Sequence, residues 1–193
     1  MILQTPLKEE QVRSLRVGDR VEITGTIYTG RDAVHKYLHE GGKLPVSLKG
    51  QVLYHCGPVT VKDKTGWKVT AAGPTTSIRE EPYQAGIIEK EGIRAIIGKG
   101  GMGQKTLDAC RRFGCVYLHA VGGAAQVLAK AIKKVKGVYL LEKFGAPEAV
   151  WELEVENFSA IVTMDANGKS LHEEIQKDSR ARLEEILSAP LFK

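Results

Sequence analysis

Apolar and polar residues alternate along the first part of the chain in short runs that predict β-strands. In DRVEITGTIYTG, residues 19–30, Val21, Ile23 and Ile27 fall on one face of such a strand. The following RDAVHKYLHEGG predicts a helix that starts at Arg31 and is stopped by its Gly-Gly pair. Two more short strands are predicted at QVLYHC and GWKVTAA, separated by the turn-rich segment GPVTVKDKTG.

The segment GPTTSIREEPYQAGIIEKEG predicts the start of another helix. Ser77 and Glu80 have the S-x-x-E spacing of a capping box, in which each side chain bonds a free backbone amide of the first turn. We therefore expect a helix to begin near residue 78.

From residue 93 onward, strand patterns alternate with helical patterns. Strands are predicted at IRAIIG, CVYLHAV and GVYLLEKF, and helices at QKTLDACRRFG and AAQVLAKAIKKV. Strands that alternate with helices favour parallel pairing in an α/β sheet.

The C-terminal part of the chain predicts two strands and a last helix. AVWELEVENF and SAIVTMDANG are the strands, closed by a turn around Asn167 and Gly168, and LHEEIQKDSRARLEEIL is an amphipathic helix expected to pack on the rest. Repeats, low-complexity tracts and linkers are absent from the sequence. We expect one domain over residues 1–193, with a core over about 1–170 and a C-terminal helix over about 170–188.

Composition and charge favour an ordinary globular protein. The chain is 42% hydrophobic and 26% charged, and no apolar stretch approaches the roughly 20 residues of a membrane span. The N-terminus lacks a secretory signal pattern, so we expect a soluble, cytoplasmic protein with no membrane partner. The 28 basic residues exceed the 23 acidic ones only mildly, and the densest run, KAIKKVK, is interpreted as the polar side and end of a helix. We expect no nucleic-acid partner.

Cysteines and histidines give weak signals for a metal site. Cys56, Cys110 and Cys115 are odd in number and lack a CxxC spacing, so we expect buried, reduced thiols. His55 and Cys56 point to opposite faces of a strand and have no third ligand nearby. The sequence therefore predicts no metal ligand. It predicts surface positions for His35 and His39, which are four apart on a helix, and assigns no role to His119 and His172.

Three places share one pattern, in which an apolar strand ends in glycine and a cation follows at or near the next helix. The cations are Arg31, Arg79 and Lys99. In α/β sheets ligands collect at the carboxyl ends of strands, and helix starts expected at Ser77 and near Gly101 would favour anions. The pattern predicts a pocket for a small ligand with at least two negative charges.

GPTTS, residues 73–77, contains more hydroxyl groups than a strand-to-helix turn requires. The Gly-Pro pair breaks the strand, and Thr76 or Ser77 can cap the helix. Thr75 is then available to hydrogen-bond a ligand, or to transfer a proton if a nearby cation such as Lys99 stabilises its alkoxide.

The glycine loop IIGKGGMG also has a competing interpretation. IIGKGG matches the apolar-then-GxxG loop of KH modules, which clamps a nucleic-acid backbone. A KH loop joins two helices, however, whereas IRAII predicts a strand before this loop, and Gln104 stands at a position that is normally apolar. A nucleotide-phosphate loop is excluded because the segment lacks both the GxxxxGK[ST] pattern and a GxGxxG that is followed by an acidic ribose ligand.

Taken together, TGRDAVHKYL, HCGPV, AAGPTTSIR, IIGKGGMG, YLHAVGGAA and EAVWELEVENFSAIVTMDANG resemble, in this order, a known family. The family that they resemble comprises the beta subunits of two-subunit class I fumarases and their tartrate dehydratase relatives. The resemblance covers about the first 170 residues. It implies an α/β fold, a swivelling β/β/α domain with a mixed, partly parallel sheet.

The resemblance also implies the activity and the partners. It implies an iron-sulfur hydro-lyase that interconverts fumarate and (S)-malate, or a subunit of L-tartrate dehydratase or mesaconate hydratase. The [4Fe-4S] cluster is then held by three cysteines of an alpha subunit, which joins this chain in a heterodimer or an α2β2 assembly and acts on a C4 dicarboxylate. This chain alone would be inactive.

Individual site residues follow from the resemblance at matching motif positions. Thr75 matches the residue proposed as catalytic base, and Lys99 matches the lysine near that base. Arg31 and Arg79 match carboxylate-binding arginines, and Thr76 is counted with the substrate-binding residues. The resemblance places no metal ligand in this chain.

Overall fold

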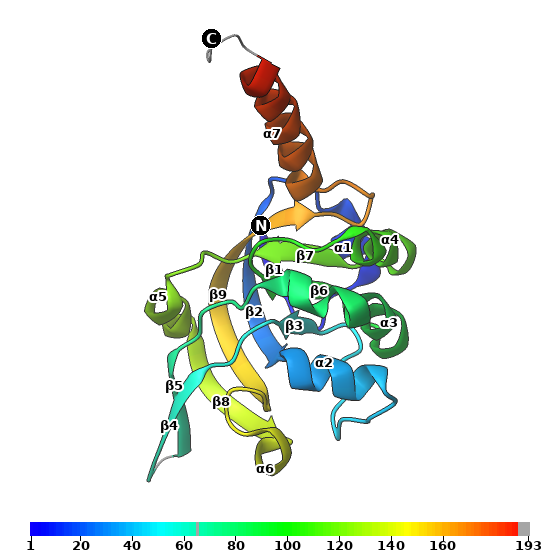
Figure 1. The fold of residues 1–193 in the computed structure, drawn as a ribbon. Coiled ribbons are helices and arrows are strands. Elements are labelled where there is room, and N and C mark those ends of the chain that lie inside the picture. The colour runs from blue at the N-terminus through cyan, green and yellow to red at the C-terminus, as the bar shows by residue number, and fades with distance from the viewer. Residues whose placement is uncertain (65, 189–193) are drawn as a thin grey trace.

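The computed structural model describes residues 1–64 and 66–188, and its centre is a sheet of seven strands (Figure 1). These are β1 (Ile2–Gln4), β2 (Arg20–Thr29), β3 (Val52–Tyr54), β6 (Ala95–Gly98), β7 (Val116–His119), β8 (Ile132–Tyr139) and β9 (Val150–Met164). Strands β2, β3, β6 and β7 are parallel neighbours in that order. Strand β9 pairs antiparallel with both β7 and β2, so these five strands close into a barrel.

The two long strands, β2 and β9, make this closure. They pair with each other along one edge. Along its other edge β2 pairs with β1 and β3, and β9 pairs with β8 and β7. The sheet is mixed and partly parallel, as the sequence predicts. It is closed rather than open, because the β2–β9 pairing joins residues more than 120 positions apart, beyond the range of local sequence patterns.

Side chains alternate between the inside of the barrel and its helix-covered outside. On β6, Ala95 and Ile97 belong to the interior hydrophobic cluster, whereas Ile96 belongs to the cluster under the helices. The outer cluster is covered by α2 (Asp32–His39), α3 (Glu81–Glu91) and α4 (Gln104–Phe113), which lie along one side of the sheet (Figure 1). The parallel strands and these helices confirm the predicted α/β alternation.

Shorter elements connect this framework. They are α1 (Glu9–Ser14), the 3-10 helix η1 (Ser77–Glu80), α5 (Ala125–Lys130) and α6 (Leu141–Phe144). None of the helices in the described part of the chain combines the length and the apolar character needed to cross a membrane.

Two antiparallel strands form a separate small sheet. They are β4 (Val59–Asp63) and β5 (Gly66–Ala71). The sequence predicts β5 but assigns the segment before it to turns, and residue 65 of that segment lies outside the described residues. The prediction is wrong for β4 because Val59, Thr60 and Val61 are β-branched, and β5 supplies their pairing partner.

The lysine-rich run after α5 is a strand rather than the end of a helix. The predicted helix over residues 124–135 ends at Lys130, and KAIKKVK leads into β8. Here Ile132, Val135 and Val138 pack against the interior cluster while β9 supplies the backbone hydrogen bonds. The predicted strand GVYLLEKF is correspondingly wrong after Tyr139, where α6 follows.

The two strands predicted near the C-terminus form the single strand β9. Between Phe158 and Val155 this strand has one more residue than the matching stretch of β2, and Asn157 adopts a positive φ of 53° there. This bulge bends β9 without ending it. The predicted turn around Asn167 and Gly168 is confirmed, with Asp165 Oδ1 accepting hydrogen bonds from Asn167 N at 2.9 Å.

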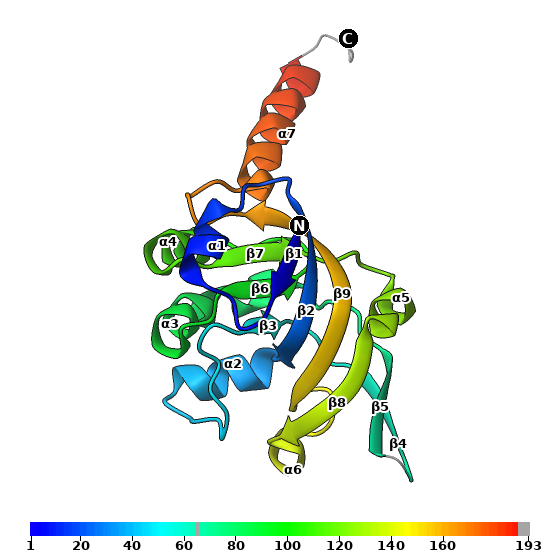
Figure 2. The ribbon, with the colours of Figure 1, turned by 180° about the vertical axis from the view of Figure 1, so that it is seen from behind.

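The last helix, α7 (Leu171–Ser188), projects away from the barrel (Figures 1 and 2). The sequence predicts this helix, but its expected packing is wrong, because none of its described residues is buried. Ile175, Leu183 and Ile186 are each more than half exposed. Residues 189–193 of the predicted domain lie outside the described residues.

Candidate active site at the carboxyl ends of the parallel strands

Two of the predicted cations lie at one edge of the barrel. Arg31 follows β2 and Lys99 follows β6, and the intervening strand β3 pairs with both in parallel. The carboxyl ends of parallel strands meet at the same edge of a sheet, so the topology places both residues there. We call this edge the rim.

The segment after β5 joins the rim although β5 belongs to the other sheet. Thr75 N donates to His55 O at 2.7 Å, Lys99 N donates to Thr75 O at 3.3 Å, and Ser77 N donates to Lys99 O at 3.0 Å. Thr76 and Lys99 form an isolated parallel bridge. The structure therefore brings Thr75, Thr76 and Lys99 together at the ends of β3 and β6, as a short insertion between them.

Glycines beside Lys99 serve internal packing. A Cβ at Gly98 would lie 1.8 Å from Ser77 Oγ, so only glycine lets the threonine-rich segment approach β6. A Cβ at Gly101, whose φ is +77°, would lie 2.4 Å from the ring of His172. The Lys99 side chain itself runs past the next loop, where a Cβ at Gly122 would lie 3.5 Å from Lys99 Cδ.

The two predicted arginines meet at an aspartate that the sequence analysis does not include. Arg79 Nη2 donates to Asp32 Oδ2 at 2.5 Å, and Arg31 Nη2 lies 4.0 Å from the same oxygen. Arg31 Nε also lies 3.3 Å from Glu148 Oε1. The Arg31 side chain is 24% exposed, although its Nε atom is buried, and the Arg79 side chain is 53% exposed.

The start of α4 does not provide the anion site that the sequence predicts near Gly101. The helix begins at Gln104, and the carboxylate of Glu81 occupies its first turn. Glu81 Oε2 accepts hydrogen bonds from Gly103 N at 2.8 Å and from Thr106 Oγ1 at 2.6 Å. The positive end of α4 is therefore already used by an internal anion.

The predicted capping box is also absent. The chain forms η1 at Ser77–Glu80 and continues as α3, but the side chain of Ser77 does not bond the first turn. Its Oγ accepts a hydrogen bond from Tyr117 Oη at 2.8 Å and lies 2.9 Å from His55 Nδ1. The Ser77 side chain points inward, where it meets the buried polar groups of His55, just after β3, and Tyr117, on β7.

His35 is fully buried, so the prediction of a surface position for it is wrong, whereas His39 is exposed as predicted. His35 Nδ1 lies 2.8 Å from the carbonyl oxygen of Arg31, and its Nε2 lies 2.9 Å from Gln84 Oε1. His55 Nε2 lies at the same 2.9 Å from that oxygen. Burial lowers the pKa of both histidines.

Glu80 is a buried acid beside this cluster. Its Oε2 lies 3.5 Å from His35 Nδ1, and neither carboxyl oxygen has a hydrogen-bond partner of good geometry among the described residues. The pKa of Glu80 is raised to about 8, chiefly by burial and then by the negative charges of Asp32 and Glu148, while the positive charge of Arg79 opposes the rise. The group therefore holds its proton at neutral pH.

His119 is a rim residue to which the sequence assigns no role. It ends β7 directly opposite Gly98, and its Nδ1 is buried without a partner among the described residues. Its ring lies 6.2 Å from that of His172, at the start of α7, and burial lowers the pKa of His119.

The described residues offer no donor set for a metal. No group of three or more His, Cys, Asp or Glu side chains among them lies close enough together to hold an ion. Cys56, Cys110 and Cys115 are free and buried, which confirms the prediction of buried thiols.

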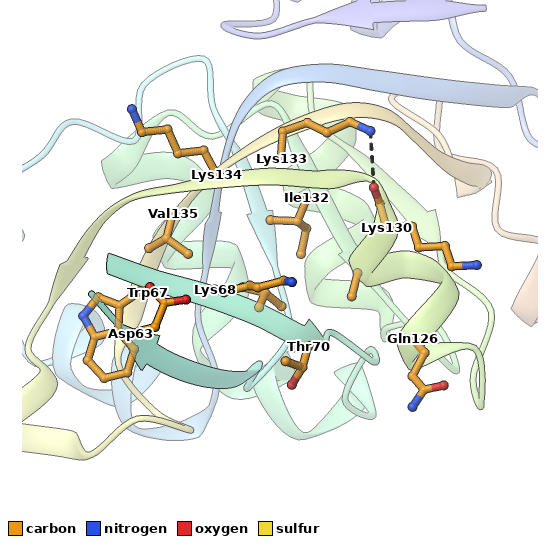
Figure 3. Close-up of a pocket in the computed structure, with 12 residues that line it drawn as sticks. Asp63, Trp67, Lys68, Thr70, Gln126, Lys130, Ile132, Lys133, Lys134 and Val135 are labelled. Carbon is orange, nitrogen blue, oxygen red and sulfur yellow. Dashed lines mark hydrogen bonds between the residues drawn. The ribbon is translucent and has the colours of Figure 1, made fainter. Parts of the chain in front are cut away.

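A cavity of about 690 Å³ lies elsewhere, between β5, α5 and β8 (Figure 3). It includes Trp67, Lys68 and Gln126 but none of the five predicted site residues. Lys133 and Lys134 extend away from it in Figure 3, and Lys133 pairs with Glu156 at 3.6 Å. The lysines here do not converge on one point.

The loop at Lys99 is not a KH loop. It connects strand β6 to helix α4, whereas a KH loop connects two helices. This observation removes the structural basis for the nucleic-acid interpretation.

Comparison with known proteins identifies relatives over nearly the whole chain. The family described as "Fumarase C-terminus" matches residues 1–175. A protein of Geobacillus stearothermophilus, provisionally named as a class I fumarate hydratase, is 60% identical over 191 residues, which are 98% of this chain but 37% of that protein.

Two further relatives are close to this chain in extent. A protein of Methanocaldococcus jannaschii, provisionally named as an L(+)-tartrate dehydratase subunit beta, is 42% identical over 94% of this chain and 95% of its own length. The L(+)-tartrate dehydratase subunit beta of Escherichia coli K12 is 36% identical over 91% of this chain and 88% of its own. The chain thus spans about a third of one relative and most of the other two.

Proposed function

This chain belongs to the Fumarase C-terminus family, and we propose from this premise that it is the beta subunit of a class I hydro-lyase that interconverts fumarate and (S)-malate. One observation carries the proposal beyond family membership. Thr75, Thr76 and Lys99 are joined by backbone hydrogen bonds at the rim, and Arg31 and Arg79 meet at Asp32 on the same side of the sheet.

The arginines are suited to the substrate's carboxylates. A guanidinium can donate two parallel hydrogen bonds to one carboxylate, and both groups are partly exposed. Asp32 and Glu148 hold them in place and neutralise part of their charge. In our proposal a substrate carboxylate takes over part of the role of Asp32.

Thr75 and Lys99 are assigned to proton transfer. In dehydration, Thr75 Oγ1 would take the proton from the carbon next to the one that loses hydroxide, and in hydration it would return that proton. A neutral threonine hydroxyl is too weak a base for this step, so Thr75 would act as the alkoxide, whose formation a nearby cation makes less costly. The Lys99 ammonium is the neighbouring cation that can provide this stabilisation, and Thr76 adds a hydroxyl for substrate binding.

The family's [4Fe-4S] cluster does not fit the residues of this chain. Such a cluster requires three thiolates that converge on one site, whereas the described residues contain no suitable donor group and the three cysteines are buried. We therefore place the cluster on a partner, the alpha subunit, as the name "subunit beta" of two relatives suggests.

The arrangement of the two parts is proposed on the same basis. We propose that residues 1–193 act as one swivelling β/β/α domain that closes its rim over the cluster of the alpha subunit, in a heterodimer or an α2β2 assembly in the cytoplasm. The 60% identical relative is long enough to contain both parts in one chain. Closure between the two parts would shield the rim from bulk solvent during the reaction.

The substrate is tested by assembling the complex. The full chain would be co-expressed with the cluster-bearing alpha subunit, purified without oxygen and assayed separately with fumarate, malate, tartrate and mesaconate. We expect fumarate and malate to be interconverted and the isolated chain to be inactive. Turnover of tartrate or mesaconate alone would reassign the substrate within the family, and no turnover of any of the four would contradict the proposal.

A further inference from the structure

Five buried polar side chains form one cluster directly beneath the rim. They lie between the outer face of the barrel and helices α2 and α3, in a layer that is otherwise apolar. Each comes from a different part of the chain: His35 from α2, His55 after β3, Ser77 from η1, Gln84 from α3 and Tyr117 from β7. All five are completely inaccessible to solvent.

Hydrogen-bond distances connect the cluster from end to end. Tyr117 Oη donates to Ser77 Oγ at 2.8 Å, and Ser77 Oγ lies 2.9 Å from His55 Nδ1. His55 Nε2 and His35 Nε2 both lie 2.9 Å from Gln84 Oε1. The two rings meet edge to face, with centroids 4.8 Å apart. The side-chain amide of Gln84 therefore joins two histidines from separate elements.

The cluster is attached to three site residues from three different loops. His35 Nδ1 lies 2.8 Å from the carbonyl oxygen of Arg31. The carbonyl oxygen of His55 accepts from Thr75 N, and Ser77 N donates to the carbonyl oxygen of Lys99. A change in the cluster would thus reach the backbone at all three positions.

The cost of burying this cluster argues for a specific purpose. Each polar group removed from water without full compensation costs free energy, and an apolar side chain in the same place would pack with the surrounding Ile87 and Ile88 at no such cost. What a hydrogen-bonded cluster adds is direction, since it fixes the distances and orientations of the groups that it joins.

We propose that Gln84 is a positioning residue of this site, whose amide joins His35 and His55 and so holds Arg31, Thr75 and Lys99 in the arrangement that the reaction needs. Gln84 does not touch the rim itself. The inference rests on the proposed function for its catalytic part, whereas the coupling between Gln84 and the rim stands independently of it.

The test compares Gln84→Met with Gln176→Met. Methionine has a similar length and flexibility but cannot hydrogen-bond the two histidine rings, and Gln176 is an exposed glutamine on α7 that serves as the matched control. Amide chemical shifts of the full chain would be measured by NMR, and kcat and KM would be measured in the complex with the alpha subunit.

For Gln84→Met we expect the amide signals of Thr75, Ser77 and Lys99 to shift, and kcat to fall at least 10-fold with KM changed less. The control should change neither. Wild-type amide shifts at Thr75 and Lys99 together with wild-type kcat would overturn the inference. If the wild-type complex were inactive while the shifts still moved, the proposed function would fail but the coupling would stand.

Ser77→Ala keeps the test decisive if Gln84→Met does not fold. This variant removes only the hydroxyl that links His55 to Tyr117 and keeps the backbone bond from Ser77 N to Lys99 O. We expect a smaller effect in the same direction, with shifted Thr75 and Lys99 signals and a several-fold lower kcat. Unchanged shifts and an unchanged kcat in this variant would also overturn the inference.

Discussion

Asp32 links the charged surface of the rim to the buried acid below it. It pairs with Arg79 and Arg31 on its outer side, and its negative charge raises the pKa of Glu80 on its inner side. Glu80 therefore stays protonated mainly because it is buried and secondly because a carboxylate lies beside it. Ionising Glu80 would place a second, buried negative charge next to Asp32.

This arrangement predicts a distinctive pH dependence of stability. With a pKa near 8 in the folded chain and an ordinary value of 4.5 when unfolded, Glu80 binds a proton in the folded state that the unfolded state has lost between these pH values. The contribution of Glu80 to the free energy of unfolding is then greatest at low pH. It falls by about 1.4 kcal/mol per pH unit between the two pKa values, 4.5 and about 8. Glu80→Gln removes this contribution.

Urea unfolding of the full chain at pH 5, 6, 7 and 8 measures the difference between Glu80→Gln and the wild type. We expect the variant to gain stability over the wild type progressively as pH rises through this range. His35 and His55, with lowered pKa values, destabilise the folded state as pH falls, but they are present in both proteins and largely cancel in the difference. Glu89→Gln, an exposed change on the following helix α3, is the control. A pH-independent difference would contradict the assignment of Glu80 as a buried neutral acid.

The sequence identifies residues of the site better than their partners. Strand-end glycines followed by cations point to Arg31 and Lys99 without knowledge of the fold. The partner Glu148 is 117 positions away from Arg31, and no local pattern connects them. The burial of His35 could have been predicted from the helical pattern. It lies next to Val34 and three residues before Leu38, on the apolar face of α2.

At the scale of elements, α4 shows how one side chain can replace a regular cap. Gly103 offers no side chain for capping, and the first turn of α4 is bonded by Glu81 from the start of α3. This contact also fixes α3 against α4, the two helices that cover β6. Negative charge at a helix start is favourable, and these bonds are charge-assisted.

We therefore expect Glu81→Ala to lower the free energy of unfolding by about 1–2 kcal/mol. The amides of Gly103 and Thr106 lose their acceptor in this variant and should exchange with solvent faster. Urea unfolding and hydrogen exchange of the full chain check both points, and Glu89→Ala is the matched control on the exposed side of α3. Equal stability of the two variants would show that Glu81 does not cap α4.

Among the elements, local patterns predict the parallel strands and their helices and fail at β8 and β4. In β8 the apolar residues at 132, 135 and 138 are spaced by three, because bulges interrupt the alternation that marks a strand. Such spacing resembles a helix until β9 is known to lie alongside. The prediction therefore fails at β8 because the pairing partner of this strand cannot be known from the local sequence.

For the whole molecule, closure of the barrel is the feature beyond the reach of local patterns. It depends on β9 reaching both β7 and β2, and the bulge at Asn157 lets this one strand do so. Closure brings the ends of β2, β3 and β6 onto one curved rim. The same architecture leaves α7 projecting from the body with its apolar residues exposed (Figure 2).

We propose that the rim is one half of an active site and that the [4Fe-4S] cluster of the alpha subunit lies on the other half. In this view the barrel provides rigid support for the dicarboxylate and the proton-transferring residues, and closure over the alpha subunit completes the site. The domain that moves need not be flexible itself, because its site residues are held by backbone hydrogen bonds to the strand ends.

The most direct test replaces Lys99 in the complex assembled without oxygen and measures fumarate hydration. Lys99→Ala should lower kcat at least 100-fold while subunit assembly stays intact, because the negative form of Thr75 loses its neighbouring cation. Lys105→Ala, at an exposed position on α4, should keep wild-type kcat. A Lys99→Ala complex that hydrates fumarate at the wild-type rate would contradict the account.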